Sequence, residues 1–136
     1  MNNQKSVSKN KGFTLIELLV VSTIIVILSA IGIVSFIGAG KGARDAKRKS
    51  DLETVRQALV LYRSDEGAYP IGGGGTGGYG DAISELLTKN YISSPTPIDP
   101  KNDTIYFYGY SSNTITFTLS AAKLEKTGLI YTLTNP

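Results

Sequence analysis

Hydrophobic residues are concentrated in one long run near the N-terminus. Residues 1–12 are polar and basic, and Phe13 to Gly38 then form 26 residues with a single charged side chain, Glu17. The uncharged part, from Leu18 to Gly40, is longer than the roughly 20 residues that a helix needs to cross the hydrocarbon core of a bilayer. The pattern therefore predicts a membrane-spanning helix.

Beyond this run, the spacing of the apolar residues changes to one of every three or four positions. The residues with this spacing are Leu52, Val55, Ala58, Leu59 and Tyr62. Such a stripe is typical of an amphipathic helix, and Gly67 followed by Pro70 supplies a stop signal. We expect one helix from about residue 13 to about residue 66, which at 1.5 Å per residue is roughly 80 Å long.

The C-terminal third has the alternation and the β-branched and aromatic residues of strands. We expect strands over residues 104–110, 114–119 and 129–134, and their short connections favour an antiparallel meander. Three strands bury too little surface alone, so we expect the amphipathic stripe to cover one face of the sheet. The predicted fold class is α+β, with a long N-terminal helix packed on a small C-terminal sheet.

Two segments lie between the long helix and these strands. The glycine-rich stretch at 71–80 predicts a flexible surface loop that takes no part in a core. The stretch at 81–91 predicts a short helix with Asp81 as its N-cap. A turn-rich connection with three prolines follows at 94–103.

Composition narrows the possible chemistry. The chain has no cysteine, which excludes disulfides and thiolate sites, and no histidine, the commonest general base and metal ligand. We therefore expect no enzymatic activity and no cofactor. The net charge of +3 and the pI near 9.1 come from Lys5, Lys9 and Lys11, because basic and acidic residues balance at 11 each from Phe13 onward.

The segment KGFTLIELLVV, residues 11–21, resembles the processing and assembly motif of type IV pilins and type II secretion pseudopilins. The resemblance implies that a prepilin peptidase cuts after Gly12 and methylates the new N-terminus at Phe13. It also implies that Glu17, the fifth mature residue, pairs with the terminal amine of a neighbouring subunit. On this basis, residues 1–12 are a leader, 13–40 the membrane and polymerisation half of the helix, and 41–136 a globular domain.

General physical arguments agree with this assignment. Glycine gives a protease close access to the backbone, and the leader lysines favour the cytoplasmic membrane surface. A carboxylate deep in a bilayer costs about 2.5–3.5 kcal/mol, so Glu17 requires a partner or a function. Two alternatives remain: Glu17 stays hydrated at the interface, or the segment is a secretory signal with a weak cleavage site at Ser29-Ala30.

The family resemblance also implies partners and a location. They are further copies of the chain and minor pilins, a prepilin peptidase and a membrane platform protein. The chain would be an inner-membrane precursor and then part of an extracellular or periplasm-spanning filament. We predict a pilus subunit. A pseudopilin of a type II secretion system is the alternative, and GAYP at 67–70 resembles that branch. A membrane-anchored binding protein that does not polymerise is a third possibility.

Other polar and aromatic clusters have two interpretations each. Asp99, Asn102 and Asp103 offer oxygens for calcium, but a hard cation takes 6–8 ligands, and turn formation explains these residues better. The basic cluster is Arg44, Lys47, Arg48 and Lys49. It could contact phosphates of DNA or lipid, or it could pair with acidic residues of neighbouring subunits. We favour pairing with neighbouring subunits, so DNA binding is possible but not predicted. The aromatic run at 106–110 predicts packing in the sheet rather than a stacking platform.

Overall fold

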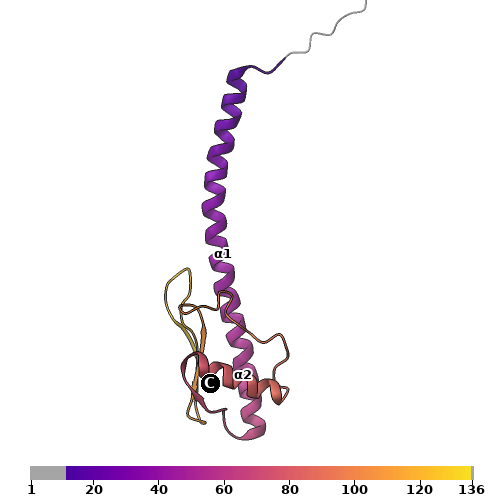
Figure 1. Ribbon diagram of the computed structural model, residues 1–136, viewed down its shortest axis with the longest axis vertical. Helices are drawn as coiled ribbons and strands as arrows, with labels where there is room; N and C mark the ends of the chain where they lie inside the picture. Colours follow the sequence, from indigo (N-terminus) through magenta and orange to yellow (C-terminus); the bar gives the residue numbers. More distant parts are fainter. Residues whose placement is uncertain (1–11, 136) are drawn as a thin grey trace, which may run out of the picture. The chain divides into compact units, whose positions relative to one another are not determined.

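The computed structural model describes residues 12–135 and contains two helices and four strands within them. They are α1 (Leu15–Glu66), β1 (Gly72–Gly73), α2 (Gly75–Thr88), β2 (Tyr108–Ser112), β3 (Phe117–Ala121) and β4 (Tyr131–Thr134) (Figure 1). The chain divides into two compact units, one ending at Ile37 and a globular unit beginning at Gly38. Apart from Gly12, the predicted leader lies outside the described residues.

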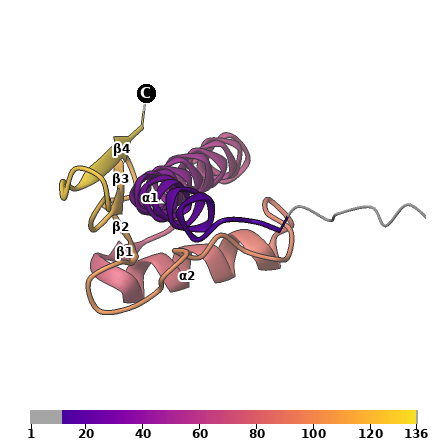
Figure 2. The same ribbon diagram turned by 90° about the horizontal axis from the view of Figure 1, so that it is seen from above.

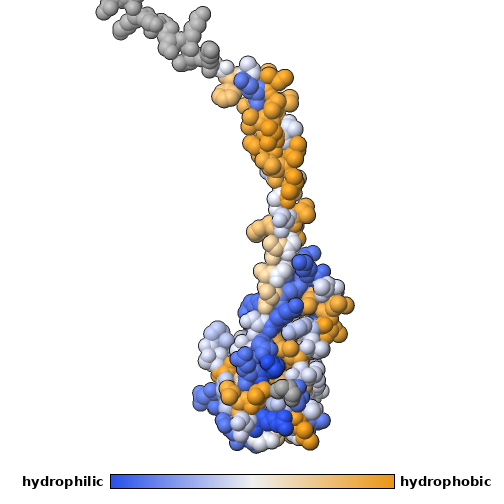
Figure 3. Space-filling model, turned by 180° about the vertical axis from the view of Figure 1, so that it is seen from behind, coloured by the Kyte–Doolittle hydropathy of each residue, from blue (hydrophilic) through white to orange (hydrophobic). Residues whose placement is uncertain are grey.

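Helix α1 confirms the predicted long helix almost to the residue. By length and composition it can cross a membrane. In the N-terminal unit its large apolar side chains are all exposed, from 87% at Leu15 down to 48% at Val20. Figure 3 shows this segment as a nearly continuous hydrophobic surface. The fold is thus the predicted α+β arrangement with an apolar N-terminal helix.

The four strands form one antiparallel sheet in the order β1-β2-β3-β4, which confirms the meander. Figure 2 shows this order, with α2 beside the β1 end of the sheet. Strand β2 begins at Tyr108 rather than at residue 104, because Asp103 Oδ1 accepts the backbone N–H groups of Ile105 and Tyr106 and closes a turn there. Asn113 accepts those of residues 115 and 116 in the same way, which delays β3 to Phe117.

The core of the globular unit joins α1, α2 and the sheet. Its fully buried side chains include Leu52, Leu59, Leu86, Tyr110 and Leu119. The amphipathic stripe of α1 therefore packs against the sheet as predicted. In the aromatic run, Tyr108 and Tyr110 are buried, which confirms packing for these two residues.

The prediction for the glycine-rich segment was wrong. Residues 72–73 pair with β2, and α2 begins at Gly75, so that Asp81 lies inside the helix and Gly74 is its N-cap. The glycines are what permit this packing. A Cβ atom on Gly78 would lie 2.6 Å from the carbonyl oxygen of Tyr110, and one on Gly72 would overlap the Tyr110 ring. The missing side chains allow two backbones to approach closely.

This packing gives two neighbouring glycines of α2 opposite responses to alanine. We expect Gly78→Ala to lower the free energy of unfolding by about 1–3 kcal/mol, because the added methyl group meets backbone atoms. Gly77→Ala is the matched control, since nothing lies within 4 Å of its Cβ position, and it should be neutral or stabilising by up to about 1 kcal/mol.

Urea unfolding of the full chain in non-ionic detergent measures this difference. All eight tyrosines lie at or after residue 62, so tyrosine fluorescence reports on the globular unit alone. Equal effects of the two substitutions would show that residues 72–78 do not pack on β2.

Candidate functional site

The predicted processing site lies at the start of α1. Gly12 and Phe13 precede the helix, and Phe13 is 86% exposed. Thr14 and Glu17 cap the first turn reciprocally. The Thr14 backbone N–H and hydroxyl donate to Glu17 Oε2 at 2.8 and 2.7 Å, and the Glu17 backbone N–H donates to Thr14 Oγ1 at 3.3 Å. This is a capping box, in which each residue satisfies a backbone donor of the other.

Thr14 is a residue that the sequence analysis missed. Its signal was a threonine followed three positions later by a glutamate, directly before an apolar run, which is the sequence signature of a capping box. Two other polar side chains of the apolar segment are satisfied inside the helix. The hydroxyls of Ser22 and Thr23 donate to the Leu19 carbonyl at 2.9 and 2.8 Å, so they suit an apolar environment. Glu17 carries a charge, and it forms no ion pair within residues 12–135.

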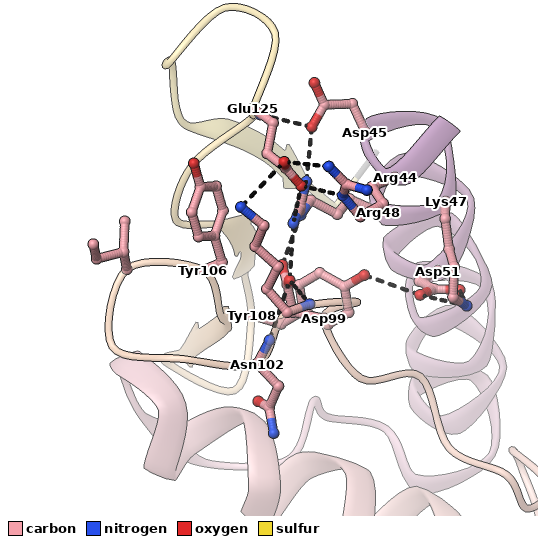
Figure 4. A network of polar contacts seen from close by, with 12 residues as sticks. Arg44, Asp45, Lys47, Arg48, Asp51, Asp99, Asn102, Tyr106, Tyr108 and Glu125 are labelled. Carbon is pink, nitrogen blue, oxygen red and sulfur yellow. Dashed lines mark hydrogen bonds and ion pairs between the residues drawn. The ribbon is translucent and has the colours of Figure 1, made fainter. Parts of the chain in front are cut away.

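A second polar cluster, the Arg48 network, connects three segments of the globular unit (Figure 4). Arg48 is fully buried and binds both oxygens of Asp99, with Nε–Oδ2 and Nη2–Oδ1 distances of 2.7 and 3.0 Å. Its Nη1 also donates to Asp45 at 2.8 Å and to Glu125 at 3.1 Å. Arg48 thereby connects α1 to two segments that are distant in the sequence.

The loop that carries Glu125 is held by further contacts of this network. Arg44 donates to both oxygens of Glu125 at 2.6 and 2.7 Å, and Lys101 Nζ lies 3.2 Å from Oε2. Asp45 accepts the backbone N–H groups of Glu125 and Lys126, both at 2.8 Å. Cations satisfy the Glu125 carboxylate, and Arg48 and two backbone donors satisfy Asp45, so the cluster is suited to holding chain segments together.

Comparison with known proteins supports the interpretation of the N-terminal motif. A family model described as "Prokaryotic N-terminal methylation motif" matches residues 7–33. Type II secretion system core protein G of Vibrio cholerae serotype O1 is 31% identical over 98 residues, which are 72% of this chain and 59% of that protein. The chain thus carries the N-terminal methylation motif and is similar to proteins of the type IV pilin and pseudopilin family. This family is structural rather than enzymatic.

Two further relatives show the same pattern. Type II secretion system core protein G of Pseudomonas aeruginosa is 32% identical over 89 residues, 65% of this chain and 57% of that protein. Prepilin peptidase-dependent protein D of Escherichia coli K12 is 37% identical over 93 residues, 63% of this chain and 56% of that protein. The chain thus spans somewhat more than half the length of these pilin-like relatives. No solved structure matches.

The structure gives other roles to the residues that were considered, and not favoured, as calcium ligands. Asp99 binds Arg48 and accepts the backbone N–H of Lys101 at 2.9 Å, and Asp103 closes the turn before β2. The Asn102 backbone N–H points to Asp99 Oδ1 at 3.5 Å. Within residues 12–135, no group of three or more histidine, cysteine or acidic side chains is arranged to hold a metal ion. Turn formation and ion pairing explain these residues.

We favoured contacts between the basic cluster on α1 and acidic residues of neighbouring subunits, but three of its four residues form ion pairs within the chain. Arg44 and Arg48 pair with carboxylates of their own globular unit rather than projecting toward neighbouring subunits. Lys47 pairs with Asp51 one helical turn away, at 3.1 Å. Of the four cluster residues, Lys49 alone forms no ion pair within the described part of the chain, and its Nζ lies 5.3 Å from the centre of the Tyr131 ring.

The network shifts the acidity of its carboxyl groups. Hydrogen bonds from Arg44, opposed by burial and aided by Lys101 and Arg48, lower the pKa of Glu125 from 4.5 to about 2. Burial raises the pKa of Asp99, but hydrogen bonds from Arg48 and from the Lys101 N–H outweigh it, so the net shift is downward. Both groups are held in their ionised form by their partners.

Removal of the central cation should destabilise the globular unit strongly. We expect Arg48→Met to lower the free energy of unfolding by about 3–5 kcal/mol, because buried carboxylates lose their partner. The neighbouring variant Lys47→Met is the control. Its side chain is 57% exposed and its single ion pair lies at the surface, so the loss should be at most about 1 kcal/mol. Urea unfolding followed by tyrosine fluorescence measures both, and similar losses would contradict a central role for Arg48.

Acid should weaken the same network. Glu125 has a lower pKa in the folded state than the usual 4.5, so its contribution to stability is complete above pH 4.5 and is lost as the pH falls toward about 2. The Glu125→Gln variant should be less stable at neutral pH and should lose less stability over this acid range. The check is urea unfolding of both chains at a series of pH values. Parallel curves would show that Glu125 does not titrate with folding.

Proposed function

We propose that this chain is a structural subunit of a type IV pilus-like filament, made as an inner-membrane precursor and cut by a prepilin peptidase between Gly12 and Phe13. The observation that carries the proposal is the methylation motif at the start of a helix whose apolar surface is exposed along residues 15–37. A polypeptide with such a surface needs either a bilayer or other apolar helices around it.

The proposed mechanism assigns a role to each part of the motif. The lysines of the leader keep it at the cytoplasmic membrane surface, where the peptidase removes it. Cleavage creates a charged amine at Phe13, and Glu17 of a neighbouring subunit pairs with it. This pairing sets the register between helices while their apolar surfaces pack together. Further copies of the chain, minor pilins and a membrane platform protein are the proposed partners.

The second candidate is a pseudopilin of a type II secretion system. It is favoured by the relatives that are named type II secretion system core protein G, in Vibrio cholerae, Pseudomonas aeruginosa and other bacteria. A pseudopilin would use the same processing and the same helix packing in a periplasm-spanning filament. The two candidates therefore share the residue roles and differ in the machine that the filament serves.

The proposal predicts that Glu17 is required for assembly but not for cleavage. Wild-type chains should begin at Phe13, carry an added methyl group and appear in the sheared extracellular or filament fraction. Glu17→Ala chains should also begin at Phe13, but they should be depleted from that fraction at least about tenfold, because a neighbouring amine loses its partner. Intact mass and N-terminal analysis of the membrane and filament fractions measure both properties.

Two variants separate this role from helix capping. Thr14→Val removes the hydroxyl that Glu17 contacts and leaves the carboxylate, so it should assemble far better than Glu17→Ala if the intersubunit pair matters. Thr23→Ala removes another polar group of the apolar segment and serves as the general control. Equal defects in Thr14→Val and Glu17→Ala would limit Glu17 to a capping role. Wild-type protein that keeps residues 1–12 would contradict the proposed processing.

A further inference from the structure

We propose that the globular unit docks on anionic phospholipid headgroups through a defined surface before the subunit assembles. This lysine-loop surface consists of Lys41, Lys49, Lys123, Lys126, Leu129 and Ile130. The inference rests on the membrane anchoring of the precursor in the proposed function. It adds a second contact with the membrane, made by the globular unit and not by the apolar helix.

Contacts of the Arg48 network bring the loop of this surface beside α1. Asp45 binds the backbone of Glu125 and Lys126, which places the loop at 122–130 beside the first turns of α1 in the globular unit. Lys49 lies over the ring of Tyr131, the residue that follows Ile130. Residues about 80 positions apart in the sequence are thereby fixed next to one another.

The lysines of this surface have charges that the fold leaves available. None of the four forms an ion pair within residues 12–135, whereas Arg44, Arg48 and Lys101 are paired in the network. The segments 41–51, 99–101 and 122–126 together contain eight basic and four acidic residues, and the rest of the globular unit contains three basic and six. The excess of positive charge therefore lies on the side of the lysine-loop surface.

The loop also presents two large apolar side chains beside these charges. Leu129 and Ile130 are 66% and 67% exposed, although Leu124 in the same loop is buried. The loop is closed by hydrogen bonds from Leu124 N–H to the Leu129 carbonyl and from Gly128 N–H to the Leu124 carbonyl, at 2.8 and 2.9 Å. Lysines flanking exposed aliphatic residues are typical of surfaces that lie in a membrane interface.

The order of the chain favours a lipid partner over a nucleic acid. Lys41 directly follows Gly40, the last residue of the uncharged run, so an anchored precursor holds Lys41 within reach of the headgroups. Phosphates of either partner would suit the lysines, but exposed aliphatic side chains gain by entering the acyl boundary and gain nothing from a DNA backbone. The docked state would keep the globular unit on the bilayer until polymerisation lifts it off.

A single-cysteine probe tests the proposal, because the chain contains no other cysteine. Ile130→Cys receives an environment-sensitive fluorophore, and Ile115→Cys is the matched control. The two isoleucines are 67% and 66% exposed, and they follow and precede β3, so they lie beyond its opposite ends. Both full-length chains are placed in nanodiscs of phosphatidylcholine alone or with phosphatidylglycerol, and quenching by lipids that carry a headgroup-level spin label is measured.

We expect the probe at 130 to shift to the blue and to be quenched in the anionic discs, and the probe at 115 to change little. Adding Lys123→Gln and Lys126→Gln should lower the ratio of docked to free states roughly tenfold or more, and raised salt should act in the same direction. Equal quenching at the two positions, or no effect of the lysine substitutions, would overturn the proposal. A response of the probe at 130 to duplex DNA but not to anionic lipid would also overturn it, in favour of a nucleic-acid surface.

Incorporation into the discs is a separate readout that keeps this inference distinct from the proposed function. Chains that are retained by the discs but do not dock contradict only the lysine-loop surface. Chains that are not retained at all contradict the membrane anchoring, and with it both proposals.

Discussion

The exposed apolar surface of α1 is the constraint on which the rest of the structure depends. Seventeen large apolar side chains between Phe13 and Ile37 are exposed. Burying one such side chain contributes about 1.5–3 kcal/mol, so their sum is tens of kcal/mol and exceeds the 5–15 kcal/mol that stabilises a typical domain. This segment therefore cannot remain surrounded by water. A transfer from bilayer to filament exchanges one apolar environment for another, which leaves the few polar groups to decide its direction.

The Arg48 network solves a different problem in the globular unit. The chain has no cysteine, and the segments around 99 and 125 contribute few residues to the core. A buried ion pair adds little net stability compared with apolar packing, but it penalises every arrangement in which a charge loses its partner. The network therefore fixes the position of these segments more than it adds to the overall free energy. The same pairing leaves the nearby lysines without carboxylate partners and so creates the charge on which the proposed lipid contact depends.

Local patterns were enough to predict the long helix, its buried stripe and the antiparallel meander, because each follows from a period of three to four or of two residues. The Arg48 network could not be predicted in this way. Arg48 meets Asp99 and Glu125 across 51 and 77 positions, and no local rule pairs them. The glycine-rich segment was misjudged for a related reason: glycine is typical of loops, and only the proximity of Tyr110 explains why residues 72 and 78 lack side chains. At the N-terminus, the motif was evident, but it obscured the simpler capping role of Thr14.

The two contacts of Glu17 connect processing to assembly in the proposed filament. In the described chain, the carboxylate accepts hydrogen bonds from Thr14, which is uncharged. Thr14 donates hydrogen bonds without a positive charge, whereas an ammonium group adds Coulomb attraction to the carboxylate, so an amine can compete for the same oxygens. Before cleavage, Phe13 has an amide nitrogen and cannot supply that charge; after cleavage, it supplies an ammonium group. Exchange of Thr14 for a neighbouring amine thus becomes favourable only for processed subunits, and uncut chains in the same bilayer lack the interaction that aligns one helix with the next.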